Sequence, residues 1–286
     1  MPLSLVHITI PSSIIIPYSS DVKELVDTSA HFVSLLKQMK IVSAGATNIG
    51  RKRKGNQDSF LMEPANGLFV VADGMGGHAG GEFASRITVE TIIQSILNDK
   101  KSGPNLEPQD LVIGAIHRAN SAVFSRAEQD KTLSGMGTTV LTMLFQATKL
   151  VVGHVGDSRV YIAKKGEIWQ LTKDHSLVNE KLRAGLITRE QLRKDKSRNV
   201  ITRSVGFESS VLVDVYQKEV NPGEIYLACS DGLSGMVEDE EILRILDEFA
   251  WDTATLDIAV NKLIERANAN GGDDNVTVVL ARADKN

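Results

Sequence analysis

The sequence predicts an α+β protein in which antiparallel strands are layered against helices. Two observations support this fold class. Helical patterns occur in pairs at both ends of the chain, and a long run of short β-branched segments lies between them. These segments follow one another as a meander, which indicates antiparallel pairing. Helix pairs separated by runs of antiparallel strands favour a layered sandwich over a doubly wound parallel sheet.

The first half of the chain carries one clear strand pattern and two helix patterns. Residues 68–72 are a short continuous apolar run, typical of a buried strand. Residues 82–97 carry apolar side chains at helical spacing. Pro108 is well suited to a first helical turn, and the apolar series from Leu111 to Val123 continues that second helix.

The second half carries the meander and a second pair of helices. A hairpin turn is expected at 164–167, and Asn221-Pro222-Gly223 is a typical turn between strands. The expected strands are 138–145, 150–155, 159–163, 168–171, 211–220, 224–230 and 275–281, and the expected helices are 238–249 and 253–269.

Composition is that of a globular protein, with 286 residues, 42% of them hydrophobic and 24% charged. The net charge of −4 argues against nucleic acid as the main partner. The chain has one cysteine, Cys229, so it cannot form an internal disulfide, which fits a reducing compartment. Cys229 lies in an apolar run. We expect it to be a core residue.

Residues 1–38 are expected to be an N-terminal extension of unknown role, followed by the main domain at 39–286. The apolar stretch 8–18 contains Pro11 and Pro17 and lacks a preceding basic region, so it is interpreted as non-secretory. No run reaches the ~20 apolar residues that cross a membrane. A cytoplasmic protein without a membrane partner is expected.

Four acidic turns are the main indication of function. Asp73 and Asp231 each follow an apolar strand and precede a glycine, while Asp58 and Asp274 lie in turns near opposite ends of the chain. Two carboxylates about 5 Å apart repel by roughly 3 kcal/mol at an effective dielectric of about 20. If the fold brings the four together, they need protons or a divalent cation.

Oxygen ligands favour hard ions, so Mg²⁺ or Mn²⁺ is expected rather than zinc or copper. Asp73 and Asp231 are expected at a sheet edge, where Gly74 leaves room for its own carbonyl to approach an ion. Arg53 is a candidate phosphate ligand because guanidinium binds phosphate oxygens bidentately. Each acidic turn taken alone is also compatible with an ordinary turn, and Arg53 with a solvated basic cluster.

Seven motifs occur in the order found in a known family. They are Arg53-x-x-Asn56-Gln57-Asp58, Asp73-Gly74-Met75-Gly76-Gly77-His78, Gly135-Met136-Gly137-Thr138-Thr139, Gly153 to Arg159, Leu171 to Ser176, Ser230-Asp231-Gly232-Leu233 and Gly272-x-Asp274-Asn275. The chain, over about residues 41–283, resembles the metal-dependent serine/threonine protein phosphatases of type 2C, the PPM family, in their bacterial form.

The resemblance implies a four-layer α-β-β-α sandwich, with two antiparallel sheets flanked by helix pairs, and a centre of two Mn²⁺ or Mg²⁺ ions. Carried over by motif, Asp73, Asp231 and Asp274 are direct metal ligands, Gly74 is a ligand through its carbonyl, Asp58 binds a metal directly or through water, and Arg53 binds the substrate phosphate. Arg53 and the four aspartates form the expected catalytic set. The implied reaction is hydrolysis of phosphoserine and phosphothreonine in proteins by a metal-activated water, without a phosphoenzyme.

Three departures from the family pattern limit what is carried over. Met75 occupies the position of a presumed general-acid histidine in eukaryotic members, and Met cannot donate a proton; His78 is expected to support the Gly-rich loop. Gly235 stands where bacterial relatives commonly have an acidic residue that is associated with a third metal ion, so the sequence leaves open whether the site holds a third metal ion. Residues 1–38 have no counterpart.

Two further aspartates are expected to be structural: Asp157 in an Asx-turn between strands, and Asp174 in the segment Asp174-His175-Ser176, which could cap a following helix. Between residues 180 and 203 there are eight basic and three acidic residues, a local charge of +5. The resemblance places this segment as a flap beside the active site, where its charge would steer phosphoproteins; a solvated helical face is the alternative.

The expected partner is a phosphorylated substrate of a serine/threonine kinase, and the protein is expected to be a monomer. Two other functions stay open on the sequence: a regulatory protein with a phosphatase fold and little catalysis, and a phosphoesterase that acts on small molecules.

Overall fold

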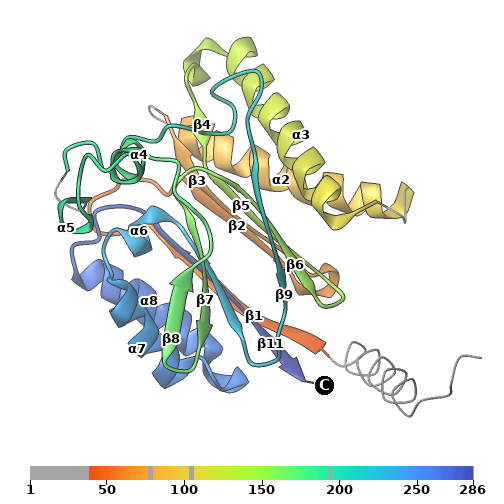
Figure 1. The fold of residues 1–286 in the computed structure, drawn as a ribbon. Coiled ribbons are helices and arrows are strands. Elements are labelled where there is room, and N and C mark those ends of the chain that lie inside the picture. The colour runs from red at the N-terminus through yellow and green to blue at the C-terminus, as the bar shows by residue number, and fades with distance from the viewer. Residues whose placement is uncertain (1–38, 77–79, 103–105, 193–194, 286) are drawn as a thin grey trace, which may run out of the picture. The chain divides into compact units, whose positions relative to one another are not determined.

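Two antiparallel sheets face each other in the computed structural model, which describes residues 39–76, 80–102, 106–192 and 195–285 (Figure 1). One sheet has the order β1-β11-β10-β7-β8, and the other has the order β2-β3-β5-β6-β9 with β4 paired to β3. The strands are β1 (Met39–Asn48), β2 (Asp58–Glu63), β3 (Leu68–Met75), β4 (Gly137–Thr138), β5 (Val140–Gln146), β6 (Lys149–Val155), β7 (Arg159–Lys164), β8 (Glu167–Gln170), β9 (Asp214–Glu219), β10 (Ile225–Cys229) and β11 (Val276–Lys285).

Two long helices cover each sheet on its outer side (Figure 1). Helices α2 and α3 pack on the sheet that contains β3, and α7 and α8 pack on the sheet that contains β10. The helices are α2 (Gly80–Ser102), α3 (Pro108–Gln129), α4 (Leu177–Arg183), α5 (Arg189–Leu192), α6 (Asp231–Ser234), α7 (Asp239–Phe249) and α8 (Leu256–Ala269), with short 3-10 turns at Pro64–Asn66, Lys131–Leu133 and Thr253–Thr255.

Three apolar clusters separate the four layers. Ile92 and Ile116 contribute to the cluster between α2, α3 and their sheet, and Leu263 contributes to the cluster under α8. The third lies between the sheets and includes Phe69 and Tyr226. Strands with helices on one face and a second sheet on the other are buried on both sides, which explains their continuous apolar sequences. The predicted four-layer sandwich is confirmed.

The strands do not form one meander, and that part of the prediction is wrong. β6 pairs with β5 and β9, whereas β7 pairs with β8 and β10 in the other sheet. The chain changes sheet at residues 156–158, where Gly156 has a φ of 111°. Glycine adopts this φ without the steric penalty of a side chain. The turn at residues 156–158, expected to join two neighbouring strands of one sheet, therefore links the two sheets.

Most other elements lie where the pattern predicts them. Residues 82–97 fall within α2, the helix at Pro108 begins there, and the hairpin at 164–167 joins β7 to β8. The run 138–145 is divided at Thr139 into β4 and β5. The N-terminal extension at 1–38 and His78 lie outside the described residues.

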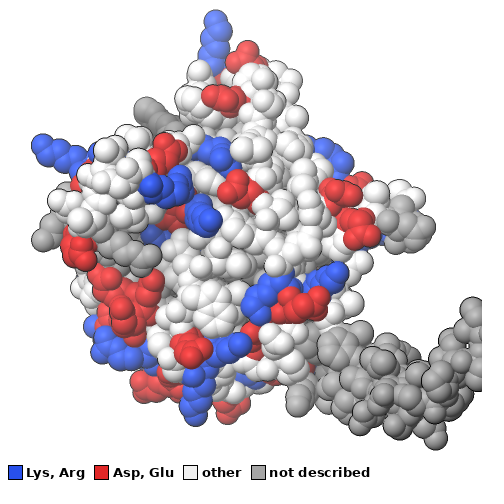
Figure 2. Space-filling view, in the orientation of Figure 1, with Lys and Arg blue, Asp and Glu red and all other residues white. Residues whose placement is uncertain are grey.

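Charge is distributed without a dominant sign over the face drawn in Figure 2, where blue and red side chains are interspersed over a mostly uncharged surface. None of the helices in the described part of the chain is long and apolar enough to cross a bilayer.

Candidate active site

The four acidic turns meet where the central strands of the two sheets end. Asp73 lies in β3 and is the Cα partner of Asp58 in β2. Asp231 begins α6 and is separated by Ser230 from β10, a strand of the opposite sheet, and Asp274 precedes β11, the neighbour of β10. Hydrogen bonds from Ser230 and Thr277 to Asp58 join the two sheets at this end. Asp73 and Asp231 both lie near the ends of buried strands, and these strands, β3 and β10, are interior to their sheets.

Burial and mutual repulsion act together on these carboxyls. Burial raises the pKa of Asp73 well above its ordinary value, and the charges of Asp58 and Asp231 raise it further. The pKa of Asp58 rises to about 7 through burial, against hydrogen bonds from Thr277 and Ser230 that lower it. Burial and the charge of Asp274 raise the pKa of Asp231, while a side-chain hydrogen bond with Asp73 lowers it.

The donor set fits a hard divalent cation. Asp58 Oδ1, Asp157 Oδ1 and Asp231 Oδ1 are buried and have no hydrogen-bond partner among the described residues. Buried carboxylate oxygens are normally hydrogen-bonded or bound to a cation, and oxygen ligands suit Mg²⁺ and Mn²⁺. No group of three or more His, Cys, Asp or Glu in the described ranges has the spacing of a formed metal site. The fit therefore rests on burial, repulsion and unpartnered oxygens.

Two glycines beside the aspartates are required by close backbone packing. A Cβ on Gly74 would lie 2.0 Å from the Gly81 carbonyl oxygen and 2.6 Å from that of Gln57. A Cβ on Gly232 would lie 1.9 Å from the Asn275 carbonyl oxygen. Such distances are shorter than any tolerated contact, so larger residues would displace the acidic turns.

Backbone and hydroxyl groups fix Asp73 in place. Its N–H donates to Thr139 Oγ1 at 2.9 Å, and its carbonyl accepts from Thr139 N and Thr138 Oγ1, each at 2.8 Å. The Thr139 hydroxyl also contacts Ser158 Oγ at 2.8 Å. The Gly137-Thr138-Thr139 motif thus holds the end of β3 against the link between the sheets.

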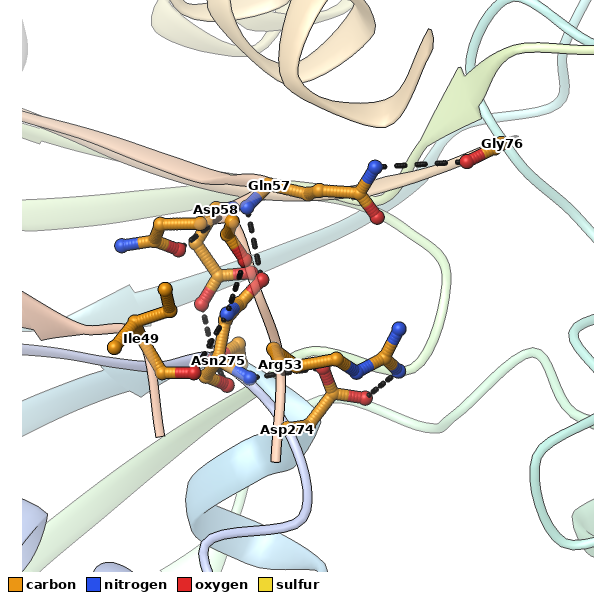
Figure 3. A network of polar contacts seen from close by, with 10 residues as sticks. Ile49, Arg53, Gln57, Asp58, Gly76, Asp274 and Asn275 are labelled. Carbon is orange, nitrogen blue, oxygen red and sulfur yellow. Dashed lines mark hydrogen bonds and ion pairs between the residues drawn. The ribbon is translucent and has the colours of Figure 1, made fainter. Parts of the chain in front are cut away.

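Arg53 points toward Asp274 (Figure 3). Its Nη2 lies 2.5 Å from Asp274 Oδ2, and the two side chains are 49% and 29% exposed. An exposed guanidinium at the rim of a buried acidic cluster can reach both the cluster and an incoming anion. The structure thus brings all the predicted site residues together.

Asn275 is a site residue that the sequence interpretation did not single out. Its Oδ1 accepts from Gln57 N at 2.8 Å, and its Nδ2 donates to the carbonyls of Ile49 and Gly55 at 2.9 and 3.0 Å (Figure 3). One amide thereby fastens the loop that carries Arg53 to the turn that carries Asp274. Its place directly after Asp274 was visible in the sequence, but its contacts were not.

Asp157 also lies beside the cluster, although the sequence interpretation left it out of the site. It is 8% exposed, and burial together with the charge of Asp231 raises its pKa to about 8. No local pattern marks Asp157 as a site residue, because the chain's change of sheet after β6 is what brings this turn to the acidic centre.

The segment Asp174-His175-Ser176 does precede a helix, with Ser176 at the N-cap position of α4, but the Asp174 side chain itself caps no helix. Its carboxylate accepts from the Arg159 guanidinium at 2.7–3.1 Å, from Gln170 Nε2 at 2.7 Å and from Asn179 Nδ2 at 3.2 Å. A buried charge needs this many donors, and they come from residues that a local pattern does not reveal.

The basic segment, residues 180–203, contains the end of α4 and all of α5 and is anchored near both of its ends. Ser176 forms an isolated bridge with Ile201, and Arg203 Nη1 donates to Asp214 Oδ1 at 2.6 Å. Within the segment, Lys181 Nζ lies 3.1 Å from Asp195 Oδ1. Some of the positive charge is therefore neutralised by neighbouring carboxylates.

A four-layer sandwich with an acidic centre between its sheets defines the architectural class. A family model described as protein phosphatase 2C matches residues 45–266. The chain belongs to the protein phosphatase 2C family, which confirms the resemblance seen in the sequence.

Named relatives and solved structures agree with this assignment. The chain is 34% identical to the serine/threonine phosphatase stp of Listeria monocytogenes, over 83% of this chain and 94% of that protein. It is 37% identical to the serine/threonine protein phosphatase PstP of Mycobacterium tuberculosis, over 83% of this chain and 44% of PstP. A crystal structure of the catalytic domain of PstP with two manganese ions superimposes with a TM-score of 0.75, at 34% identity, over 86% of this chain and 99% of that chain.

Proposed function

We propose that this protein hydrolyses phosphoserine and phosphothreonine in proteins, with two Mn²⁺ or Mg²⁺ ions as cofactors. The observation that carries the proposal is the set of buried carboxylates that two sheets bring together, with oxygens that have no partner among the described residues. Two relatives, stp of Listeria monocytogenes and PstP of Mycobacterium tuberculosis, are named serine/threonine phosphatases, and a structure of the PstP catalytic domain contains two manganese ions.

The metal ligands in this proposal are Asp58, Asp73, Asp231 and Asp274, with the Gly74 carbonyl as a further oxygen donor. When bound, divalent ions supply charge stabilisation and lower the pKa of a water that attacks phosphorus. The protein contributes the rigid placement of the carboxylates at the ends of interior strands, held by Thr138, Thr139 and Asn275 through the hydrogen bonds described above.

Arg53 binds the phosphate of the substrate in this proposal. Its side chain is half exposed and lies at the rim of the acidic cluster, where its guanidinium meets Asp274. A guanidinium binds two phosphate oxygens at once and holds them in a defined orientation. The same charge offsets part of the repulsion between an anionic substrate and the carboxylates.

Phosphoproteins made by a serine/threonine kinase are the proposed substrates, and the protein acts as a cytoplasmic monomer. The basic residues of the segment 180–203 attract acidic substrate surfaces, and Arg203 at its end is anchored to Asp214. Residues 1–38 are proposed to be a separate N-terminal extension, with the phosphatase domain at 39–286.

The test is phosphate release from phosphothreonine peptides with Mn²⁺, with Mg²⁺ and with a chelator, compared with a panel of small phosphate esters. We expect phosphate release from the peptides with either metal ion, and we expect the chelator to abolish it. Preference for a small ester would indicate a small-molecule phosphoesterase. Manganese binding without turnover would indicate a regulatory protein, and no binding would overturn the proposal.

A further inference from the structure

Both hydrogen bonds that Asp58 Oδ2 accepts come from hydroxyl groups of the opposite sheet. Thr277 Oγ1, in β11, donates at 2.6 Å, and Ser230 Oγ, directly after β10, donates at 2.8 Å. All three residues are buried. The other oxygen, Asp58 Oδ1, is buried and has no hydrogen-bond partner in the described ranges. The two oxygens of one carboxylate therefore have different surroundings.

The hydrogen bonds that lead to Thr277 begin at a backbone amide. Asp58 N–H can only donate, and it donates to Asn56 Oδ1 at 3.1 Å. The Asn56 side-chain NH₂ must then face Thr47 Oγ1, 2.8 Å away. Thr277 Oγ1 donates its proton to Asp58 Oδ2, so in its 2.7 Å contact with Thr47 Oγ1 it accepts and Thr47 donates.

The second donor is oriented in the same way. Thr277 N–H donates to Ser230 Oγ at 3.0 Å, so the Ser230 hydroxyl proton points away from Thr277. Two acceptors are in reach of that proton: Asp58 Oδ2 at 2.8 Å and the Asn275 carbonyl at 3.4 Å. The shorter contact to a carboxylate is the stronger hydrogen bond. Both hydroxyls thus direct a proton to the same oxygen.

We infer that Thr277 and Ser230 are positioning residues for the proposed metal site, because they hold Asp58 Oδ2 and leave Oδ1 as the oxygen available to a divalent cation. The inference rests on the proposed function and assigns a role to two residues that do not themselves face the ion. Hydrogen-bonding partners of metal ligands typically change metal affinity by about 10- to 100-fold when they are removed.

The test is calorimetric titration of the full chain with MnCl₂, without substrate. Thr277→Val keeps the shape and removes the hydroxyl, and it is expected to weaken manganese binding by about 10-fold. Thr277→Ser restores the hydroxyl and is expected to stay within about 3-fold of the wild type. Thr142→Val is the matched control, since Thr142 is a buried threonine in β5 whose Oγ1 has no partner among the described residues.

A second readout separates positioning from general damage. The phosphatase activity of Thr277→Val should approach the wild-type kcat when manganese is raised to saturation, while the manganese concentration for half-activity stays higher. Ser230→Ala supplies an independent variant if Thr277→Val does not fold, and the same shift is expected for it.

The outcomes distinguish this inference from the proposed function. Wild-type affinity in Thr277→Val and Ser230→Ala would overturn the inference alone, and so would equal weakening in Thr277→Ser or in Thr142→Val. A wild-type protein that binds no manganese and releases no phosphate would overturn the proposed function and the inference together.

Discussion

Arg53 Nη2 lies 2.5 Å from Asp274 Oδ2, so a proposed phosphate ligand and a proposed metal ligand form an ion pair across 221 positions of sequence. Asp274 is thereby paired on one side, while Asp231 lies close enough for their charges to interact. A cation bound to Asp274 would weaken the pull of that carboxylate on Arg53, and the guanidinium would then be available to an anion.

Replacing Arg53 with alanine should therefore weaken substrate binding more than metal binding. Loss of a charge-assisted contact of about 1.5–3 kcal/mol predicts a fall in kcat/KM for phosphopeptides of roughly 10- to 100-fold. The affinity for Mn²⁺ should stay the same or increase, because a competing cation has been removed. Steady-state kinetics and calorimetry measure the two effects.

Lys52→Ala is the control for Arg53→Ala, since it removes a neighbouring charge that pairs with Asp273 at 2.7 Å. It is expected to change kcat/KM by less than about 3-fold, because an exposed ion pair contributes little. If both variants lose activity equally, the general positive charge of the loop matters and Arg53 has no special role.

Asp73→Asn should abolish activity and yet stabilise the protein when metal is absent. The pKa of Asp73 is raised by burial and by the charges of Asp58 and Asp231, so its ionised form is unfavourable in the folded state. The amide removes that charge and one of the proposed ligands. We expect phosphate release to fall by more than about 1,000-fold, and the melting temperature in chelator to rise.

Thermal unfolding of the wild type and of Asp73→Asn in EDTA and in MnCl₂ measures the change in stability with and without metal. Manganese should raise the melting temperature of the wild type and have a smaller effect on Asp73→Asn. Glu265→Gln, at an exposed ion pair on α8, is the control and should behave as the wild type in both buffers. A melting temperature in chelator that falls in Asp73→Asn would contradict the electrostatic argument.

The layers could be predicted from the sequence because they follow from local patterns. The apolar spacing in α2 and α3 and the continuous apolar run of β3 are set by burial, which acts residue by residue. The assignment of β6 and β7 to different sheets could not be predicted this way. A turn with glycine at its start is compatible with a hairpin and with a link between sheets.

The same distinction applies to the acidic site. Asp73 and Asp231 could be found because each combines an apolar run, a carboxylate and a glycine. Asp157 was not recognised, since its proximity to Asp231 depends on the sheet to which β7 belongs. The contacts of Asn275 with three separate backbone groups also depend on tertiary structure.

Gly74→Ala should disrupt the site through the backbone. The added methyl group would lie 2.0 Å from the Gly81 carbonyl oxygen, so the start of α2 and the end of β3 must separate. Overpacking of this kind costs about 1–3 kcal/mol. Gly55→Ala is the control, because a Cβ at Gly55 has no atom within 4 Å. Urea unfolding and manganese titration of both variants should show losses only for Gly74→Ala.

Glu224 makes the free energy of unfolding depend on pH in the acidic range. It is 1% exposed, and Lys218, Asn221 and Tyr226 all donate to its carboxylate, Tyr226 at 2.6 Å. Burial alone raises the pKa of this group, but the hydrogen bonds outweigh burial and lower the pKa from 4.5 to about 2. The ionised carboxylate is therefore the form that the folded protein favours.

Because the folded-state pKa is the lower one, the unfolded chain takes up the proton first as the pH falls. The stabilisation by Glu224 is complete above about pH 4.5 and is lost as the pH falls toward 2. Glu224→Gln should cost about 1–3 kcal/mol at pH 7, and its difference from the wild type should shrink below pH 4.5. Urea unfolding of both proteins between pH 3 and 7 measures this difference. A difference that stays constant over that range would show that the charge of Glu224 contributes nothing.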